Sequence, residues 1–143
     1  MVYRLLNSGD QALLQAAFDG LFDCDVQPDL SARFLSDPRH HIAVAIKDSL
    51  VVGFATAVNY IHPDKPEELW TDEVGASAAR CGRGAAEALL KSLLECGREL
   101  GCGEAWVLTE TPNIPANGLY SKLGGAPQQQ AMYSFELGVH GSE

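Results

Sequence analysis

Residues 79–90 read Ala-Arg-Cys-Gly-Arg-Gly-Ala-Ala-Glu-Ala-Leu-Leu, a short turn rich in arginine and glycine that runs straight into an amphipathic helix. Gly82 and Gly84 lack a Cβ, so the backbone can take a positive φ and approach a ligand closely. The free N–H groups of the first helical turn, together with the helix dipole, suit a phosphate or pyrophosphate. Arg80 and Arg83 add positive charge. The alternative is an ordinary helix N-terminus, because a short glycine motif alone is a weak signal.

Strands and helices alternate on both sides of this turn. Hydrophobic periodicity and turn residues predict strands at 2–6, 42–46, 50–59, 69–76, 105–109 and 132–137. The same patterns predict helices at 12–22, 28–37, 84–100 and 114–123, with Gly101 as the C-cap of the long one. This order gives an α/β domain with one mixed sheet, and residues 139–143 form a short tail.

Length and charge limit the possible functions. The 143 residues suffice for one domain with one hydrophobic core. Neither a run of 18 apolar residues nor a signal-peptide pattern is present, so we expect a cytoplasmic protein without a membrane partner. The net charge of −9 disfavours nucleic acid and anionic membrane surfaces. It suits a cationic substrate, or it only keeps the protein in solution.

The cysteines and histidines do not predict a metal site. Cys24, Cys81, Cys96 and Cys102 match no zinc spacing, and in the cytoplasm we expect free thiols. Cys96 lies on the apolar face of the helix at 84–100 and is expected in the core.

The strand at 69–76, the glycine turn, the helix, the strand at 105–109 and the helix beginning at Asn113 together resemble the GNAT superfamily of acyl-CoA-dependent N-acyltransferases. The resemblance covers the chain from about Ile42 and is best between Asp72 and Gly125. It implies one GNAT domain over residues 1–138. The implied α+β fold has a single mixed, mostly antiparallel sheet of six to seven strands flanked by about four helices. The sheet is splayed between 69–76 and 105–109, with CoA in the gap.

The resemblance also implies how acetyl-CoA is held. The backbone amides that would bind its pyrophosphate belong to Gly82, Arg83, Gly84, Ala85 and Ala86. The family has Arg or Gln where this chain has Cys81, and the neighbouring Arg80 and Arg83 are the residues available to compensate. The pantetheine would pair with a bulged strand at Val74, Gly75 and Ala76. Gly75 is consistent with a bulge there or with close packing.

Acyl transfer to an amine needs a group that accepts the amine proton, because an ammonium has no lone pair. The resemblance places Glu73 in this role, and alternation along the strand would turn Asp72 the other way. Glu110, after the strand at 105–109, is the second candidate. The alternative is that these carboxylates only decorate strand ends.

The helix beginning at Asn113 supplies the remaining residues. In the resemblance Asn113 contacts CoA and the Tyr120 hydroxyl lies near the thioester sulfur. The two are seven residues apart, which is two helical turns on one face. A phenol can protonate the leaving thiolate. The alternative is that Tyr120 is a core aromatic residue.

The acceptor is the least determined part. The run from Asp72 and the strand at 105–109 look most like the type I aminoglycoside 3-N-acetyltransferases. The acidic residues Asp19, Asp23, Asp25 and Asp29 could bind ammonium groups or serve as turn and capping residues. A polyamine, a small metabolite amine and a protein amine remain open, as does a catalytically weak CoA-binding or regulatory module, which the substituted Cys81 favours. The oligomeric state is open too, with a homodimer as one option.

Overall fold

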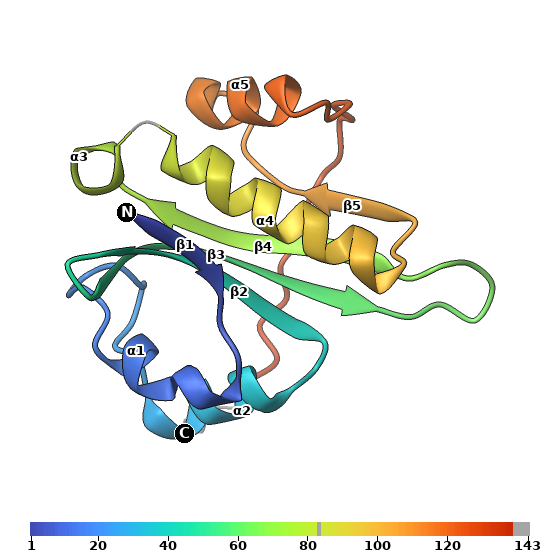
Figure 1. The fold of residues 1–143 in the computed structure, drawn as a ribbon. Helices are drawn as coiled ribbons and strands as arrows, with labels where there is room; N and C mark the ends of the chain where they lie inside the picture. The colour runs from blue at the N-terminus through green and yellow to red at the C-terminus, as the bar shows by residue number, and fades with distance from the viewer. Residues whose placement is uncertain (83, 139–143) are drawn as a thin grey trace. The chain divides into compact units, whose positions relative to one another are not determined.

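The computed structural model describes residues 1–82 and 84–138, apart from the side chain of residue 78 (Figure 1). The chain forms two compact units, Met1–Glu110 and a smaller one that begins at Thr111. Within the described residues, no helix is long and apolar enough to cross a bilayer.

The first unit contains a five-stranded sheet in the order β1-β2-β3-β4-β5. Its strands are β1 Val2–Leu5, β2 His40–Lys47, β3 Leu50–Tyr60, β4 Glu68–Ala76 and β5 Glu104–Val107. The pairs from β1 to β4 are antiparallel, whereas β4 and β5 are parallel. The mixed, mostly antiparallel sheet is therefore confirmed, but it has five strands where six to seven were predicted.

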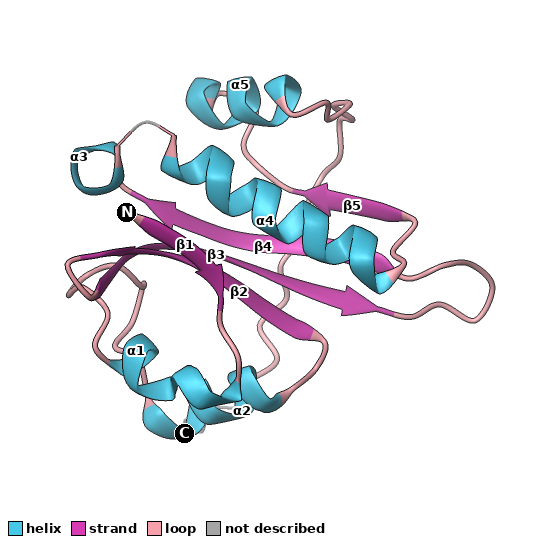
Figure 2. Ribbon diagram, viewed as in Figure 1, coloured by secondary structure: helices cyan, strands magenta, loops and turns pink. Residues whose placement is uncertain are grey.

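Helices cover both faces of the sheet (Figure 2). The long helix α4, Ala85–Leu100, packs on one face, and α1 (Gln11–Gln15) and α2 (Pro28–Ser36) lie on the other. The α4-side cluster consists of Ala43, Ala45, Val52, Ala55, Ala57, Leu69, Cys81, Ala85, Leu89 and Leu93. The cluster on the α1/α2 face consists of Leu14, Ile42, Val44, Val51 and Phe54. Burial of each large side chain contributes about 1.5–3 kcal/mol, so these two clusters hold the layers together.

The long helix matches its prediction closely. Gly101 ends it in the left-handed region at φ 85°, where glycine avoids strain. The backbone N–H groups of Gly101 and Cys102 donate to the carbonyls of Arg98 and Gly97. Leu100, the last residue of the helix, was expected from its apolar character to face the sheet, but it is 40% exposed.

The first predicted helix is much shorter in the structure. A 3-10 turn at Ser8–Asp10 leads into α1, which ends at Gln15. The chain then folds back, because the Phe18 N–H donates to the Val51 carbonyl and Gly20 takes φ 83°. This path brings the Phe22 ring onto Phe54 at 4.1 Å between centroids, a contact that a continuous helix would not make.

The second unit contains one helix, α5, Ile114–Lys122. The predicted strand at 132–137 is wrong: these residues lie outside any strand, and Met132, Tyr133, Phe135 and Leu137 are 74–82% exposed. An alternating pattern makes a strand only where a neighbouring strand supplies hydrogen-bond partners, and no such partner lies within the described residues. The predicted tail at 139–143 lies outside the described residues.

Candidate active site

The glycine turn lies between β4 and α4, as the sequence predicts. A one-turn helix, α3 (Ala78–Cys81), precedes it. Gly82 has φ 82°, and a Cβ on Gly82 or Gly84 would meet nothing within 4 Å. Space above both glycines is therefore open. The first-turn amides of α4, including those of Ala85 and Ala86, have no partner within the helix by its geometry. Arg83 lies outside the described residues.

The side chains around this turn are committed to packing. Cys81 is 7% exposed, and its thiol donates to the Val52 carbonyl at 3.0 Å. Burial raises the pKa of the Cys81 thiol. The Arg80 guanidinium lies 3.5 Å from the centroid of the Phe18 ring, a cation–π contact. These two side chains are therefore engaged in contacts within the protein, and the groups at the turn that remain for an anion are the backbone amides.

The strand before the turn, β4, has strand partners on both sides in its first half but on one side alone in its second half. The β4–β5 ladder runs from Glu68–Glu104 to Thr71–Val107 and ends there, while β4 continues to Ala76. On its other side β4 remains paired with β3 up to Ala76. Among the described residues, the outer edge of β4 after Thr71 therefore has no strand partner and can pair with an extended ligand.

A β-bulge lies in β4, but at Asp72 and not at Gly75. Thr56 pairs with Glu73 and Ala57 with Thr71, so Asp72 is the extra residue. Gly75 pairs regularly with Phe54. A Cβ on Gly75 would lie 2.5 Å from Phe54 Cε1, so close packing is the reason for this glycine.

The bulge decides which face carries Glu73. Leu69 belongs to the α4-side cluster, and strict alternation would put residue 73 on that same face. The extra residue reverses the alternation. Val74 and Ala76 now pack against the α4-side cluster, and Glu73 lies on the α1/α2 face. Its N–H donates to Thr56 Oγ1 at 3.2 Å, which fixes the backbone there.

The electrostatics around Glu73 favour a proton acceptor near neutral pH. Partial burial raises the pKa of Glu73, and the carboxylates of Asp72 and Asp23 raise it further. Of the four acidic residues singled out between 19 and 29, the structure thus links Asp23 to Glu73. From simple alternation we expected the Asp72 side chain to point away from Glu73. Because Asp72 is the bulge residue, that alternation does not hold there. A carboxylate with a raised pKa is better matched to general-base work at neutral pH.

The remaining site candidates come later in the chain. Because β5 ends at Val107, Glu110 lies in an exposed loop and not at a strand end. In the second unit, Asn113 caps α5, with its Oδ1 accepting from the Ala116 N–H at 3.2 Å. Tyr120 is half-buried, and burial raises the pKa of its hydroxyl.

Two tryptophans that were not singled out from the sequence, Trp70 on β4 and Trp106 on β5, are register partners on these neighbouring strands. Their side chains stack at 5.4 Å between ring centroids. Trp106 Nε1 donates to the Tyr60 hydroxyl at 2.6 Å, and that hydroxyl donates to Glu68 at 3.0 Å. Alternation from Leu69 puts Trp70 on the α1/α2 face with Glu73. The feature of the sequence that could have indicated this pair is the presence of one tryptophan in each of the two predicted strands.

The fold is that of an α+β acetyltransferase. Residues 10–125 match the acetyltransferase (GNAT) family, and the chain belongs to this family. No curated protein matches the chain in sequence.

Solved structures share the fold at low identity. An aminoglycoside acetyltransferase from an uncultured soil metagenomic sample superposes with a TM-score of 0.81 at 23% identity, covering 95% of this chain and 97% of its own. The aminoglycoside N-acetyltransferase AAC(6')-Iy in complex with CoA gives 0.74 at 19% identity, covering 94% and 98%. The ribosomal-protein-alanine N-acetyltransferase of Brucella melitensis biovar Abortus 2308 gives 0.72 at 17% identity, covering 95% and 100%. At these identities the likeness shows the fold alone.

Proposed function

We propose that this protein transfers the acetyl group of acetyl-CoA to a primary amine, with Glu73 as the general base. The observation that carries the proposal is the bulge at Asp72. It turns Glu73 to the α1/α2 face, where the Asp23 carboxylate helps to raise its pKa, immediately before the strand edge that lacks a partner in the described residues. A base and a surface for an extended thioester thus lie on consecutive residues of one strand.

The proposed reaction is direct attack. The neutral amine adds to the thioester carbonyl, and its proton passes to Glu73 directly or through water. The C–S bond then breaks, and the CoA thiolate takes a proton from the Tyr120 hydroxyl. The raised pKa of Glu73 suits the first transfer. Glu110 is the reserve candidate for the base.

Acetyl-CoA is proposed to bind through main-chain groups. The open space above Gly82 and Gly84 admits a pyrophosphate against the amides of the turn, including those of Ala85 and Ala86. The backbone amide of Arg83 is proposed for the same role. The edge residues Val74, Gly75 and Ala76 would pair with the pantetheine amides, and Asn113 would contact CoA. Because Cys81 is directed into the core, loss of the usual Arg or Gln removes a side-chain contact but leaves the amides available.

The acceptor is proposed to be a small polycation, aminoglycoside-like or a polyamine. The Asp23, Asp72 and Glu73 carboxylates lie close enough to influence one another and would attract ammonium groups. Two of the structural neighbours act on aminoglycosides. A protein amine is the second candidate, because a ribosomal-protein-alanine acetyltransferase shares the fold nearly as well.

A thermal titration with CoA tests the cofactor half of the proposal. Acetyl-CoA at 100 times its Kd should stabilise the native state by about 2.7 kcal/mol, because it binds only the folded chain. Gly84→Glu should abolish this shift by placing bulk and negative charge above the turn. Gly84→Ala, which adds only a methyl group where a Cβ meets nothing within 4 Å, is the matched control and should keep the shift. Absence of stabilisation in the wild type at millimolar acetyl-CoA would overturn the proposal.

An amine panel tests the acceptor half. Aminoglycosides, polyamines and peptides with free N-termini are each mixed with acetyl-CoA, and released thiol is measured. Turnover with polycations above peptides supports the proposed class, whereas turnover with peptides alone selects the second candidate. CoA binding without turnover of any amine would identify a regulatory module.

A further inference from the structure

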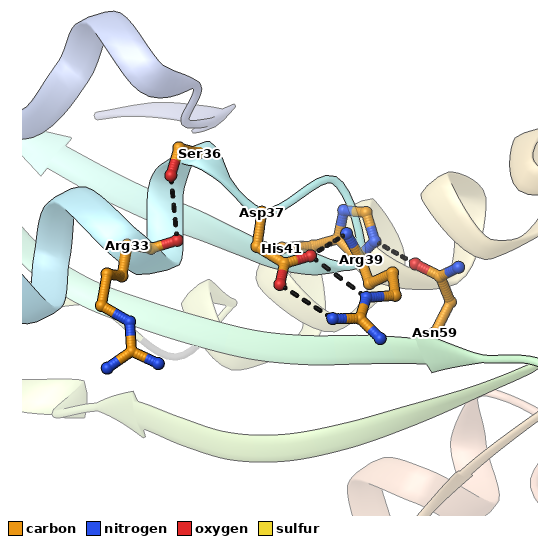
Figure 3. Close-up of polar contacts among 6 residues, drawn as sticks. All are labelled: Arg33, Ser36, Asp37, Arg39, His41 and Asn59. Atoms are coloured by element: carbon orange, nitrogen blue, oxygen red, sulfur yellow. Dashed lines mark hydrogen bonds and ion pairs between the residues drawn. The ribbon is translucent and has the colours of Figure 1, made fainter.

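Four side chains on the α4 face form a hydrogen-bonded series that the acetyl-transfer site does not use. Cys96 Sγ lies 3.7 Å from His41 Nδ1, and His41 Nε2 lies 2.7 Å from Asn59 Oδ1. Asn59 Nδ2 donates to Glu67 Oε1 at 3.1 Å. The His41–Asn59 contact can be followed in Figure 3. The series joins α4, β2, β3 and the loop before β4.

The direction of the hydrogen bonds in the series follows from the Asn59 amide. The Asn59 amide presents its NH₂ to Glu67 and its oxygen, which can only accept, to His41. His41 Nε2 therefore carries a hydrogen. In a neutral ring Nδ1 is then the unprotonated nitrogen, and it faces the Cys96 thiol as a proton acceptor.

The end of α4 brings a second thiol to the same place. Cys102 donates its N–H to the Gly97 carbonyl and Gly101 donates to Arg98, the pattern of a Schellman cap. In this cap the residue at the Cys102 position folds back over the residues at positions 97 and 96. Gly97 has no side chain, and Cys102 packs against the α4-side cluster. Burial raises the pKa of Cys96, and the charges of Glu99 and Cys102 raise it further, so Cys102 lies within electrostatic range of Cys96.

We propose that Cys96 and Cys102 form a reversible disulfide when the protein meets a peroxide, with His41 accepting the Cys96 proton. The thiolate of Cys96 attacks a peroxide oxygen, the O–O bond breaks, and the leaving oxygen takes the proton from His41. Cys96 becomes a sulfenic acid. Cys102 sulfur then displaces that oxygen as water and forms the S–S bond. Two thiols lose two electrons and two protons, and the peroxide is reduced.

Cys96 needs this assistance more than an ordinary thiol. It is 9% exposed, and burial raises its pKa, so little thiolate forms unless a neighbour accepts the proton. Cys102 is half-buried, which leaves a path for a small oxidant. Cys81 provides the contrast: it is equally buried, but its thiol donates to a backbone carbonyl, which cannot take the proton away.

Peroxide oxidation of the full chain tests the proposal. Limiting hydrogen peroxide should remove about 2 Da from the intact mass, reversibly with dithiothreitol, because one disulfide has formed. Peptide mapping should place the bond between Cys96 and Cys102. Cys96 should react faster than Cys81 in the same wild-type molecule, a comparison that needs no variant. Equal rates at Cys96 and Cys81, or a bond to another cysteine, would overturn the proposal.

Two variants separate the steps. Cys102→Ser should stop the reaction at a Cys96 sulfenic acid that dimedone traps. His41→Gln should slow Cys96 oxidation by roughly 10²-fold because the proton acceptor is lost. His40→Gln, at the adjacent exposed position, is the control and should leave the rate unchanged. If His41→Gln is folded by circular dichroism and oxidises Cys96 at the wild-type rate, the role of His41 is refuted.

Discussion

The two halves of β4 differ in pairing and in chemistry, although they belong to one strand. Residues 68–71 pair with β3 on one side and β5 on the other, and they carry the fully buried Leu69 and Thr71. Residues 73–76 pair with β3 alone and carry Glu73. Asp72 separates the halves as a bulge.

This difference shows how one inserted residue changes both the face and the pairing of the residues that follow it. Before the bulge, side chains alternate between the core under α4 and the stacked tryptophans. After it, the alternation is reversed and the outer edge is left without a strand partner among the described residues. We therefore expect Glu68 and Glu73, one glutamate in each half, to have different roles, and the two residues make the contrast testable.

Glu73→Gln should have the largest effect. Removing a general base should lower kcat by roughly 10²–10⁴-fold while leaving acetyl-CoA binding intact. Glu68→Gln, in the first half of the strand, is the matched control. Its amide oxygen can still accept from the Tyr60 hydroxyl, so kcat should stay near the wild-type value. Steady-state kinetics with the best acceptor amine measure kcat for both variants. Equal kcat values for Glu73→Gln and Glu68→Gln would show that Glu73 is not the base.

Leu69→Ala should destabilise the fold through the first half of β4. Leu69 is fully buried against α4, and Gly97 approaches it so closely that a Cβ there would lie 3.0 Å from Leu69 Cδ2. We expect a loss of about 2–5 kcal/mol in the free energy of unfolding, because a cavity remains. Leu69→Met should lose less than about 1.5 kcal/mol. Urea denaturation measures both, and kcat of the folded fraction should be unchanged. A fall in kcat without a fall in stability would contradict the division between the halves.

The first half of β4 was predictable from the sequence, whereas the bulge was not. Apolar runs and helical periodicity identified β2, β3, β4 and α4 to within a few residues, because these elements supply most of the side chains in the two buried clusters. Gly75 looked like the bulge because glycine is common in bulges. The extra residue at Asp72 is set by the register with β3, which involves residues 17 positions earlier in the chain. Periodicity within one segment carries no information about such pairing.

The candidate site was predictable in part for the same reason. The glycine turn and the cap by Asn113 are local features, and both are present in the structure. The link between Glu73 and Asp23, and the inward direction of Cys81, depend on contacts between distant segments. The strand at 132–137 failed because its pattern was strand-like but a partner strand was missing from the described residues.

Gly75→Ala tests the close approach of Gly75 to the Phe54 ring in the second half of β4. The new methyl group would meet the Phe54 ring, which is 3% exposed and stacked on Phe22, so the ring cannot move away freely. Overpacking should lower the free energy of unfolding by about 1–3 kcal/mol. Gly84→Ala, with open space around it, should be nearly neutral in the absence of ligand. Calorimetry compares the two, and a Gly75→Ala variant as stable as the wild type would mean that Phe54 has room to shift.

Asp23→Asn should have the smallest effect of these substitutions. The direction in which it moves the pH profile of kcat/KM tests the role of Glu73. The Asp23 carboxylate raises the pKa of Glu73, so removing its charge should lower that pKa. Glu73 would then stay ionised to lower pH, and the acidic limb of the kcat/KM profile should move down by a few tenths of a pH unit, since exposed charges interact weakly. Asp48→Asn removes the same charge in the β2–β3 turn and should leave the limb in place. A shift in both variants would show that overall charge moves the profile, whereas a shift to higher pH in Asp23→Asn would contradict Glu73 as the titrating base. Because acidic residues that bind a cationic acceptor change KM, the profile of kcat alone then separates the effect on the base from the effect on binding.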